Sequence, residues 1–182
     1  MSKNLKFCIY LFVICLTFLS CRKIDNNELH QDTNNNFVSG EINVAFTEDT
    51  KLSDAFNLVD SLNLEIRKIW GQTYVSKLPT DSITFISSYL HSKNYIEDEG
   101  IFFDDELNGT KVSCTLVDVD RNIFSDWEKS IETLQLIELP CVIVFYLKTP
   151  IDSEKYWIEK FKEYQIVKWA ALNDIRVIET GP

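Results

Sequence analysis

The chain has 182 residues, of which 45% are hydrophobic and 25% charged, and its formal net charge is −10. This composition supplies a core for one ordinary domain or two small ones, and it excludes an intrinsically disordered chain. The acidic balance argues against a nucleic acid partner and against electrostatic adhesion to anionic lipid, because both need clustered lysine and arginine.

The first twenty residues predict a secretory signal. Lys3 and Lys6 provide a positive start, and an almost purely apolar run follows from Phe7 to Leu19. This run of about 13 residues is shorter than the ~20 that a membrane-spanning helix needs. A short apolar run behind a positive start is typical of the hydrophobic region of a signal peptide.

Cys21 stands directly after this run. The residues before it, Phe18-Leu19-Ser20, resemble the relaxed lipobox of Bacteroidota lipoproteins. The resemblance implies that residues 1–20 are removed and that the thiol of Cys21 is diacylated, and several acyl chains hold a protein stably on a membrane. A plain signal peptide cleaved near Ser20 and an uncleaved anchor are the alternatives.

Residues 21–38 predict a flexible tether, because they are rich in asparagine and poor in apolar side chains. In lipoproteins of this kind an Asp after the lipidated Cys is associated with retention in the inner membrane. Arg22 occupies that position here. The resemblance therefore implies a cell-envelope protein anchored in the outer membrane, with the periplasmic and the exposed face both open.

Residues 39–107 predict a first unit of order β-α-β-β-α-β. Gly71-Gln72 separates two of its strands and predicts a hairpin turn, and Asp81 is placed to cap its second helix. The expected strands cover 41–47, 64–70, 73–78 and 95–103, and the expected helices begin near Ser53-Asp54 and after Pro79.

Residues 108–182 predict a second unit of the same order. Asn108-Gly109 is a strong hairpin signal that opens it, and Pro140 separates its two middle strands. The expected strands cover 111–119, 136–139, 141–147 and 166–170, with helical stripes at 124–134 and behind Asp152, and one extra strand at 175–178.

Short matches in constant register indicate that the two units arose by duplication. Ser53-Asp54 corresponds to Ser125-Asp126, and Leu62-Asn63-Leu64 corresponds to Leu134-Gln135-Leu136 at the same offset. The predicted fold class is therefore α+β, with two tandem ferredoxin-like (β-α-β-β-α-β) sandwich units after the signal and the tether. Because units of this size are marginal alone, we expect them to pack together.

Histidine and cysteine usage points away from catalysis. His30 lies in the tether, and His91 lies at a predicted helix end, where a cationic ring suits the helix dipole. Cys114 and Cys141 belong to neighbouring strands at an offset that exceeds the disulfide limit of about 7 Å between Cα atoms, so we expect buried thiols. No catalytic, cofactor-binding or metal-ligating residue is predicted, no cofactor is expected, and the chain is predicted not to be an enzyme.

Acidic runs and tryptophans are the other candidate features. Residues 97–99 and 104–106 predict a solvated acidic rim, because their spacing does not match a calcium-binding EF-hand. Trp127 and Trp157 lie on apolar helical stripes and are expected in the core. Trp70 and Trp169 lie near strand ends and are the expected surface tryptophans, where an aromatic face can stack on a sugar or another ligand.

The first unit resembles the propeptide module of subtilisin-like proteases. The resemblance is carried by the segment 40–46, by Leu78-Pro79 and by the segment 90–96. It implies a ferredoxin-like fold, which by itself does not assign a function. The predicted function is a membrane-anchored, non-enzymatic binding or assembly module of the cell envelope, whose partner is an envelope protein. A propeptide-like protease inhibitor is the first alternative, and an enzyme with an unrecognised site is the second.

Overall fold

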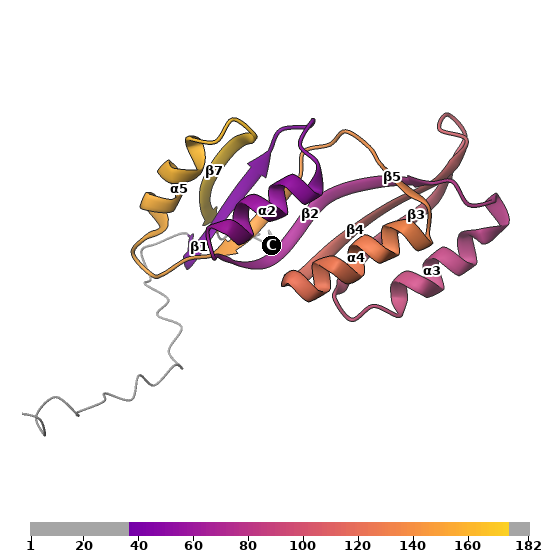
Figure 1. Cartoon of the computed structure of the whole chain (residues 1–182), viewed down its shortest axis with the longest axis horizontal. Coiled ribbons are helices and arrows are strands. Elements are labelled where there is room, and N and C mark those ends of the chain that lie inside the picture. Colours follow the sequence, from indigo (N-terminus) through magenta and orange to yellow (C-terminus); the bar gives the residue numbers. More distant parts are fainter. Residues whose placement is uncertain (1–36, 175–182) are drawn as a thin grey trace, which may run out of the picture. The chain divides into compact units, whose positions relative to one another are not determined.

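The computed structural model describes residues 37–174, which form strands and helices throughout. The described part is an α+β protein with four α-helices and one seven-stranded antiparallel sheet (Figure 1). The predicted signal, most of the tether and the extra strand at 175–178 lie outside the described residues. The elements are β1 (Phe37–Phe46), α2 (Leu52–Ser61), β2 (Glu65–Ser76), a 3₁₀ turn (Thr80–Ser82), α3 (Ile83–His91), β3 (Ile96–Asp104), β4 (Gly109–Val119), α4 (Arg121–Thr133), β5 (Leu136–Glu138), β6 (Val144–Lys148), α5 (Glu154–Lys162) and β7 (Val167–Asp174).

The sheet order mixes strands from the two halves of the chain. It runs β3-β4-β2-β6-β1-β7, and β5 pairs with β2 beside β6. The long strand β2 contacts both of these later strands. Its first half, Glu65–Trp70, pairs with β6, and its last residues, Tyr74–Ser76, pair with β5. One continuous sheet therefore joins segments that the sequence assigns to separate units.

The hairpin predicted at Gly71-Gln72 is wrong. β2 continues through these residues with a bulge in its pairing with β4 between Ile69 and Gln72. Gly71 has φ of 94°, a conformation that glycine adopts readily, so it serves a bulge and not a turn. The segment that links β5 to β6 passes along the edge of β2 here, and a Cβ atom on Gly71 would clash with the carbonyl oxygen of Val142.

The hairpin predicted at Asn108-Gly109 is confirmed, with a longer loop. β3 and β4 pair antiparallel from Ile96 opposite Leu116 to Asp104 opposite Gly109, so residues 105–108 form the connection. Asn108 has φ of 46°, which is the left-handed conformation that asparagine tolerates best among residues with a side chain.

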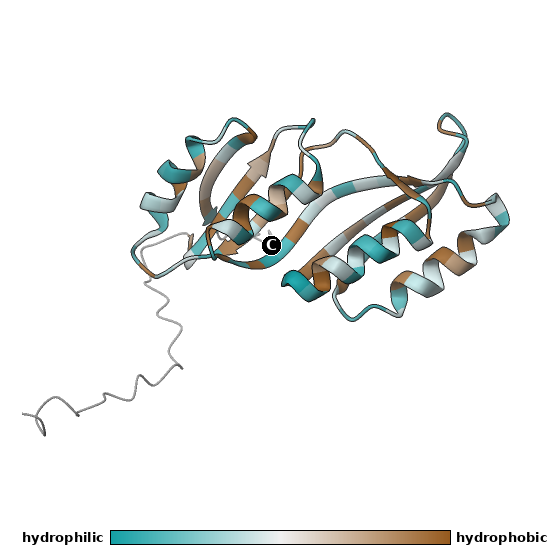
Figure 2. Cartoon of the chain, in the orientation of Figure 1, coloured by the Kyte–Doolittle hydropathy of each residue, from teal (hydrophilic) through white to brown (hydrophobic). Residues whose placement is uncertain are grey.

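The four helices cover one face of the sheet, and the core lies between the two layers. Alternate strand residues such as Val44, Ile69 and Phe145 are buried against helix side chains in one cluster. Phe56 of α2 stacks on Phe124 of α4 with ring centroids 3.9 Å apart, so helices from the two halves of the chain pack directly on each other. Figure 2 shows α4 largely hydrophilic on its outer side, with hydrophobic strand segments behind it.

The helices differ in how their N-termini are capped. Asp120 caps α4 by accepting from the backbone N–H of Ile123 at 2.8 Å. The N-terminus of α2 is instead capped from β5, because the Leu52 N–H donates to Glu138 Oε1 at 3.0 Å. The prediction that Asp81 caps α3 is wrong: this residue lies in the 3₁₀ turn before the helix, and the Ser82 N–H bonds to the Pro79 carbonyl at 2.8 Å.

Candidate functional site

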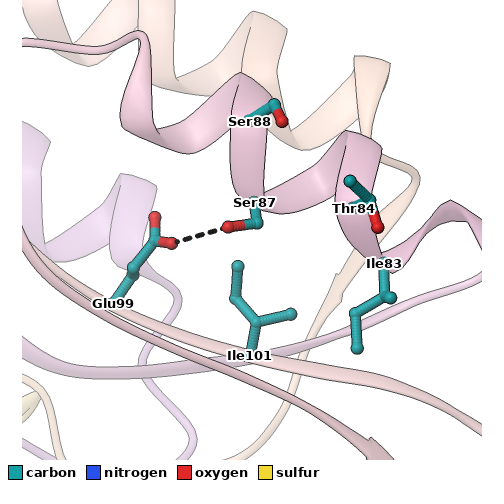
Figure 3. Close-up of a pocket in the computed structure, with 6 residues that line it drawn as sticks. All are labelled: Ile83, Thr84, Ser87, Ser88, Glu99 and Ile101. Atoms are coloured by element: carbon teal, nitrogen blue, oxygen red, sulfur yellow. Dashed lines mark hydrogen bonds between the residues drawn. The ribbon is translucent and has the colours of Figure 1, made fainter.

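A cavity of about 390 Å³ lies between α3 and β3 (Figure 3). Its wall combines hydroxyl groups, one carboxylate and two isoleucines. The Ser87 hydroxyl donates to Glu99 Oε1 at 3.3 Å, as the dashed line in Figure 3 shows. Although Glu99 belongs to a run expected to be a solvated rim, only 15% of its side chain is exposed. The lining residues are Ile83, Thr84, Ser87, Ser88, Glu99 and Ile101.

His91 joins these residues without forming a catalytic triad. It is the last residue of α3, as the sequence predicts, and its side chain is 70% exposed. Its Nδ1 atom lies 3.2 Å from Ser87 Oγ and 3.0 Å from Glu99 Oε1. A serine-histidine-carboxylate relay needs the serine and the acid on opposite ring nitrogens. Here Nδ1 faces both groups. The ring therefore cannot take a proton from the serine at one nitrogen while a carboxylate holds the other nitrogen.

A second cavity of about 440 Å³ lies where α2 ends beside β2 and β4. Its two arginines are already paired with carboxylates. Arg121 contacts Asp60 at 2.5 Å and also lies over the ring of Phe56. Arg67 contacts Glu65 and Asp118 at 3.5 and 3.7 Å. These pairs offset the positive charge that an anionic ligand would need.

A cluster of ionisable groups joins α4 to the segment between α3 and β3. Asp126 accepts from Lys93 Nζ at 2.8 Å and from the Tyr95 hydroxyl at 2.7 Å. These bonds, that of Lys93 above all, lower the pKa of Asp126. Burial raises the pKa of Tyr95. Neither of the two cavities is lined by these residues. The cluster therefore holds α4 against the segment between α3 and β3.

Cysteine and acidic residues were the remaining candidates. Cys114 and Cys141 are free thiols, but only Cys114 is buried as expected, and Cys141 is half-buried. Burial raises the pKa of Cys114 to about 12, with a further contribution from Glu99. Within residues 37–174, no group of three or more His, Cys, Asp or Glu side chains could hold a metal ion. Cys21, the predicted lipidation site, lies outside the described residues, as does His30.

The face of the sheet opposite the helices carries the largest exposed aromatic side chains of the strands. Trp70 is 55% exposed and Trp169 41% exposed, which confirms both as surface tryptophans. Trp127 is fully buried and Trp157 packs against the core, as predicted. We call this surface the helix-free face, because no helix of the described residues covers it.

The two exposed tryptophans belong to one row of paired residues. Trp169 pairs with Ala45, Ala45 pairs with Val144, and Val144 pairs with Trp70. Directly paired residues of antiparallel strands project to the same face. Trp70 and Trp169 therefore flank two small, buried side chains, and we call these four residues the Trp row.

A polar row lies beside the Trp row on the same face. It consists of Ala171, Asn43, Tyr146 and Lys68, which are paired in that order across β7, β1, β6 and β2. The Asn43 amide donates to Asn173 Oδ1 at 3.2 Å, and Lys68 forms an ion pair with Glu97.

Sequence reasoning missed the exposed hydrophobic side chains at the other end of this face. Phe102 and Ile137 are each half exposed there, and Lys111 lies over the Phe102 ring. The alternating pattern of β3 offers a weak signal for Phe102, whereas Ile137 lies in a strand too short to show a period.

In the part of the chain that the structure describes, no helix is long and apolar enough to cross a membrane. No protein-family model, curated protein or solved structure matches this chain.

Proposed function

We propose that this protein is a non-enzymatic binding module of the cell envelope, anchored through a lipid on Cys21, that engages its partner with the helix-free face. The observation that carries the proposal is the Trp row, in which two indoles stay exposed on the uncovered side of an otherwise packed sheet. Large aromatic side chains are enriched where proteins bind other molecules, since they bury much area with few rotatable bonds.

The chemistry of the cavities supports a binding role over a catalytic one. The Ser87, His91 and Glu99 side chains meet at a single ring nitrogen, and the arginines of the second cavity are paired with acids. Neither arrangement supplies the oriented acid, base or nucleophile that an enzyme needs.

The architecture fits two copies of a ferredoxin-like unit that have exchanged half of their elements with each other. The strands β7-β1-β6 and the first half of β2, with α2 and α5, have the strand order of one ferredoxin-like sandwich. The strands β3-β4, the second half of β2 and β5, with α3 and α4, have the order of another. In this proposal each tandem unit, 39–107 and 108–182, gives half of its elements to each sandwich, and Gly71 and Val142 lie side by side where the two sandwiches join.

The test of the function is capture of partners from detergent-extracted envelope by the whole protein. We expect material that is retained by the wild type and lost when Trp70 and Trp169 are both replaced by alanine. Tyr156→Ala is the matched control, because Tyr156 is an exposed aromatic residue on α5 and lies outside the helix-free face. Equal capture by the wild type and the double variant would refute a role for this face. A protease among the captured partners would favour the inhibitor function.

The lipid anchor has a separate test. We expect the mature N-terminus to be Cys21 carrying acyl chains, detected by mass spectrometry of the purified protein. In Cys21→Ser the protein should leave the membrane fraction, because several acyl chains supply the stable anchoring that the acidic body does not. An unmodified Cys21 in the mature chain would contradict the anchor.

A further inference from the structure

We infer that the ligand of the Trp row is a neutral carbohydrate chain, stacked on Trp70 and Trp169 as two separate platforms. The inference rests on the proposed function, because it names the ligand class for the same face. It is drawn from the spacing of the indoles, the polar row beside them and the pairing of the nearby charges.

The spacing favours a linear ligand made of repeated rings. Trp169 and Trp70 are three strand positions apart, and strands lie about 4.8 Å apart, so their Cα atoms are separated by about 14 Å. Ala45 and Val144 between them are buried and present almost no surface to a ligand. A ligand that reaches both indoles must therefore lie across the strands.

Stacking on an indole suits a sugar ring. The face of an indole carries negative charge from its π-electrons, and the C–H groups on one side of a pyranose ring present weakly positive hydrogens to it. An exposed tryptophan lies at each end of the row. The intervening residues provide no aromatic surface, so the two platforms act on different sugar rings.

The polar row provides hydrogen-bonding groups at the right distance from these platforms. Asn43, Tyr146 and Lys68 lie one pair of residues along the strands from the Trp row, on the same face. Asn43 Oδ1 has no hydrogen-bond donor among the residues that the structure describes. That oxygen is itself buried, so the Tyr146 hydroxyl and the Lys68 ammonium, which belong to partly exposed residues of the row, are the groups that a sugar hydroxyl would meet.

The charges on this face favour a neutral ligand. Lys148 contacts Glu65 at 3.3 Å, and Lys68 is paired with Glu97, so the basic side chains near the rows are neutralised. The protein as a whole carries −10, which repels nucleic acids and anionic glycans. A protein partner usually buries clustered anchors at the centre of an interface, whereas these indoles are set apart by small residues.

The experiment measures binding of the whole protein, purified in detergent, to four soluble neutral polysaccharides: a β-glucan, an α-glucan, a mannan and a xylan. Affinity electrophoresis screens the panel, and titration calorimetry measures the dissociation constant for any that retards the protein. We expect one or more to bind, and Trp70→Ala and Trp169→Ala each to weaken binding about tenfold. Trp70→Phe keeps an aromatic platform and should retain most of the affinity, and Tyr156→Ala should not change it.

Two results would overturn the inference directly. One is the absence of binding to all four polysaccharides at millimolar sugar. The other is binding that stays unchanged in the Trp70→Ala, Trp169→Ala double variant. Enzymatic treatment of the envelope extract separates the carbohydrate inference from the proposed function. Suppose that capture depends on both tryptophans, survives treatment of the extract with glycosidase and is lost when the extract is proteolysed. The carbohydrate inference then fails, while the proposed binding function stands.

Discussion

Replacing Gly71 by alanine tests the close approach of β2 to the segment that links β5 to β6. Gly71 combines φ of 94° with a backbone carbonyl, that of Val142, in the space that a Cβ atom would take. An L-residue is disfavoured in the left-handed region by about 1–2 kcal/mol. Forcing an extra methyl group against packed backbone costs typically about 1–3 kcal/mol. We therefore expect Gly71→Ala to lower the free energy of unfolding by about 3 kcal/mol.

The measurement is equilibrium unfolding in urea, followed by circular dichroism, with the slope of the transition checked for a change. Gly100→Ala is the matched control on β3. An added Cβ there meets the hydroxyl oxygen of Ser113, which is the end of a side chain that can rotate away, and Gly100 does not have positive φ. We expect the control to cost less than about 1 kcal/mol. If both variants lose the same free energy, or if Gly71→Ala loses less than about 0.5 kcal/mol, the close approach of Val142 to Gly71 is wrong.

Three further predictions concern burial. Trp127→Ala should lower the free energy of unfolding by about 4 kcal/mol in the same urea assay, because a fully buried aromatic side chain is lost, whereas Trp169→Ala should cost about 1 kcal/mol at most. Burial raises the pKa of Glu138, so its contribution to stability is fully present below the ordinary glutamate pKa and is lost as pH rises through the raised value. In Glu138→Gln the free energy of unfolding should therefore fall less between pH 4 and pH 7 than it does in the wild type. The same pH dependence in both proteins would contradict this. Cys114, with its pKa raised to about 12, should resist iodoacetamide at pH 8 in the native protein and react in denaturant, as peptide mapping by mass spectrometry would show.

Local signals in the sequence were sufficient for the parts of the fold that depend on neighbouring residues. The stripe containing Phe124 and Trp127 predicted a helix with a buried face, and Asn108-Gly109 predicted a hairpin, since both features are encoded within a few residues. The exposure of Trp70 and Trp169 also followed from their positions near the ends of predicted strands.

Strand partners could not be predicted in the same way. Gly71-Gln72 has the residues of a turn, but the strand continues there because it pairs with β4 on both sides of the bulge and lies against the segment around Val142, far along the chain. The carboxylate that caps α2 comes from Glu138, far along the chain from Leu52, so no capping motif precedes the helix. The Trp row joins four strands, and its members become neighbours only once the pairing of β1, β2, β6 and β7 is known.

The sheet order has a consequence for the time course of folding. β1 is made early in synthesis, yet both of its partners, β6 and β7, lie near the other end of the chain. Pairings between residues far apart in sequence form slowly, because a long loop must close before any contact is gained. The emerging N-terminal half would therefore expose an unpaired strand until residues 144–174 arrive, and an exposed strand edge is a site where growing chains can aggregate.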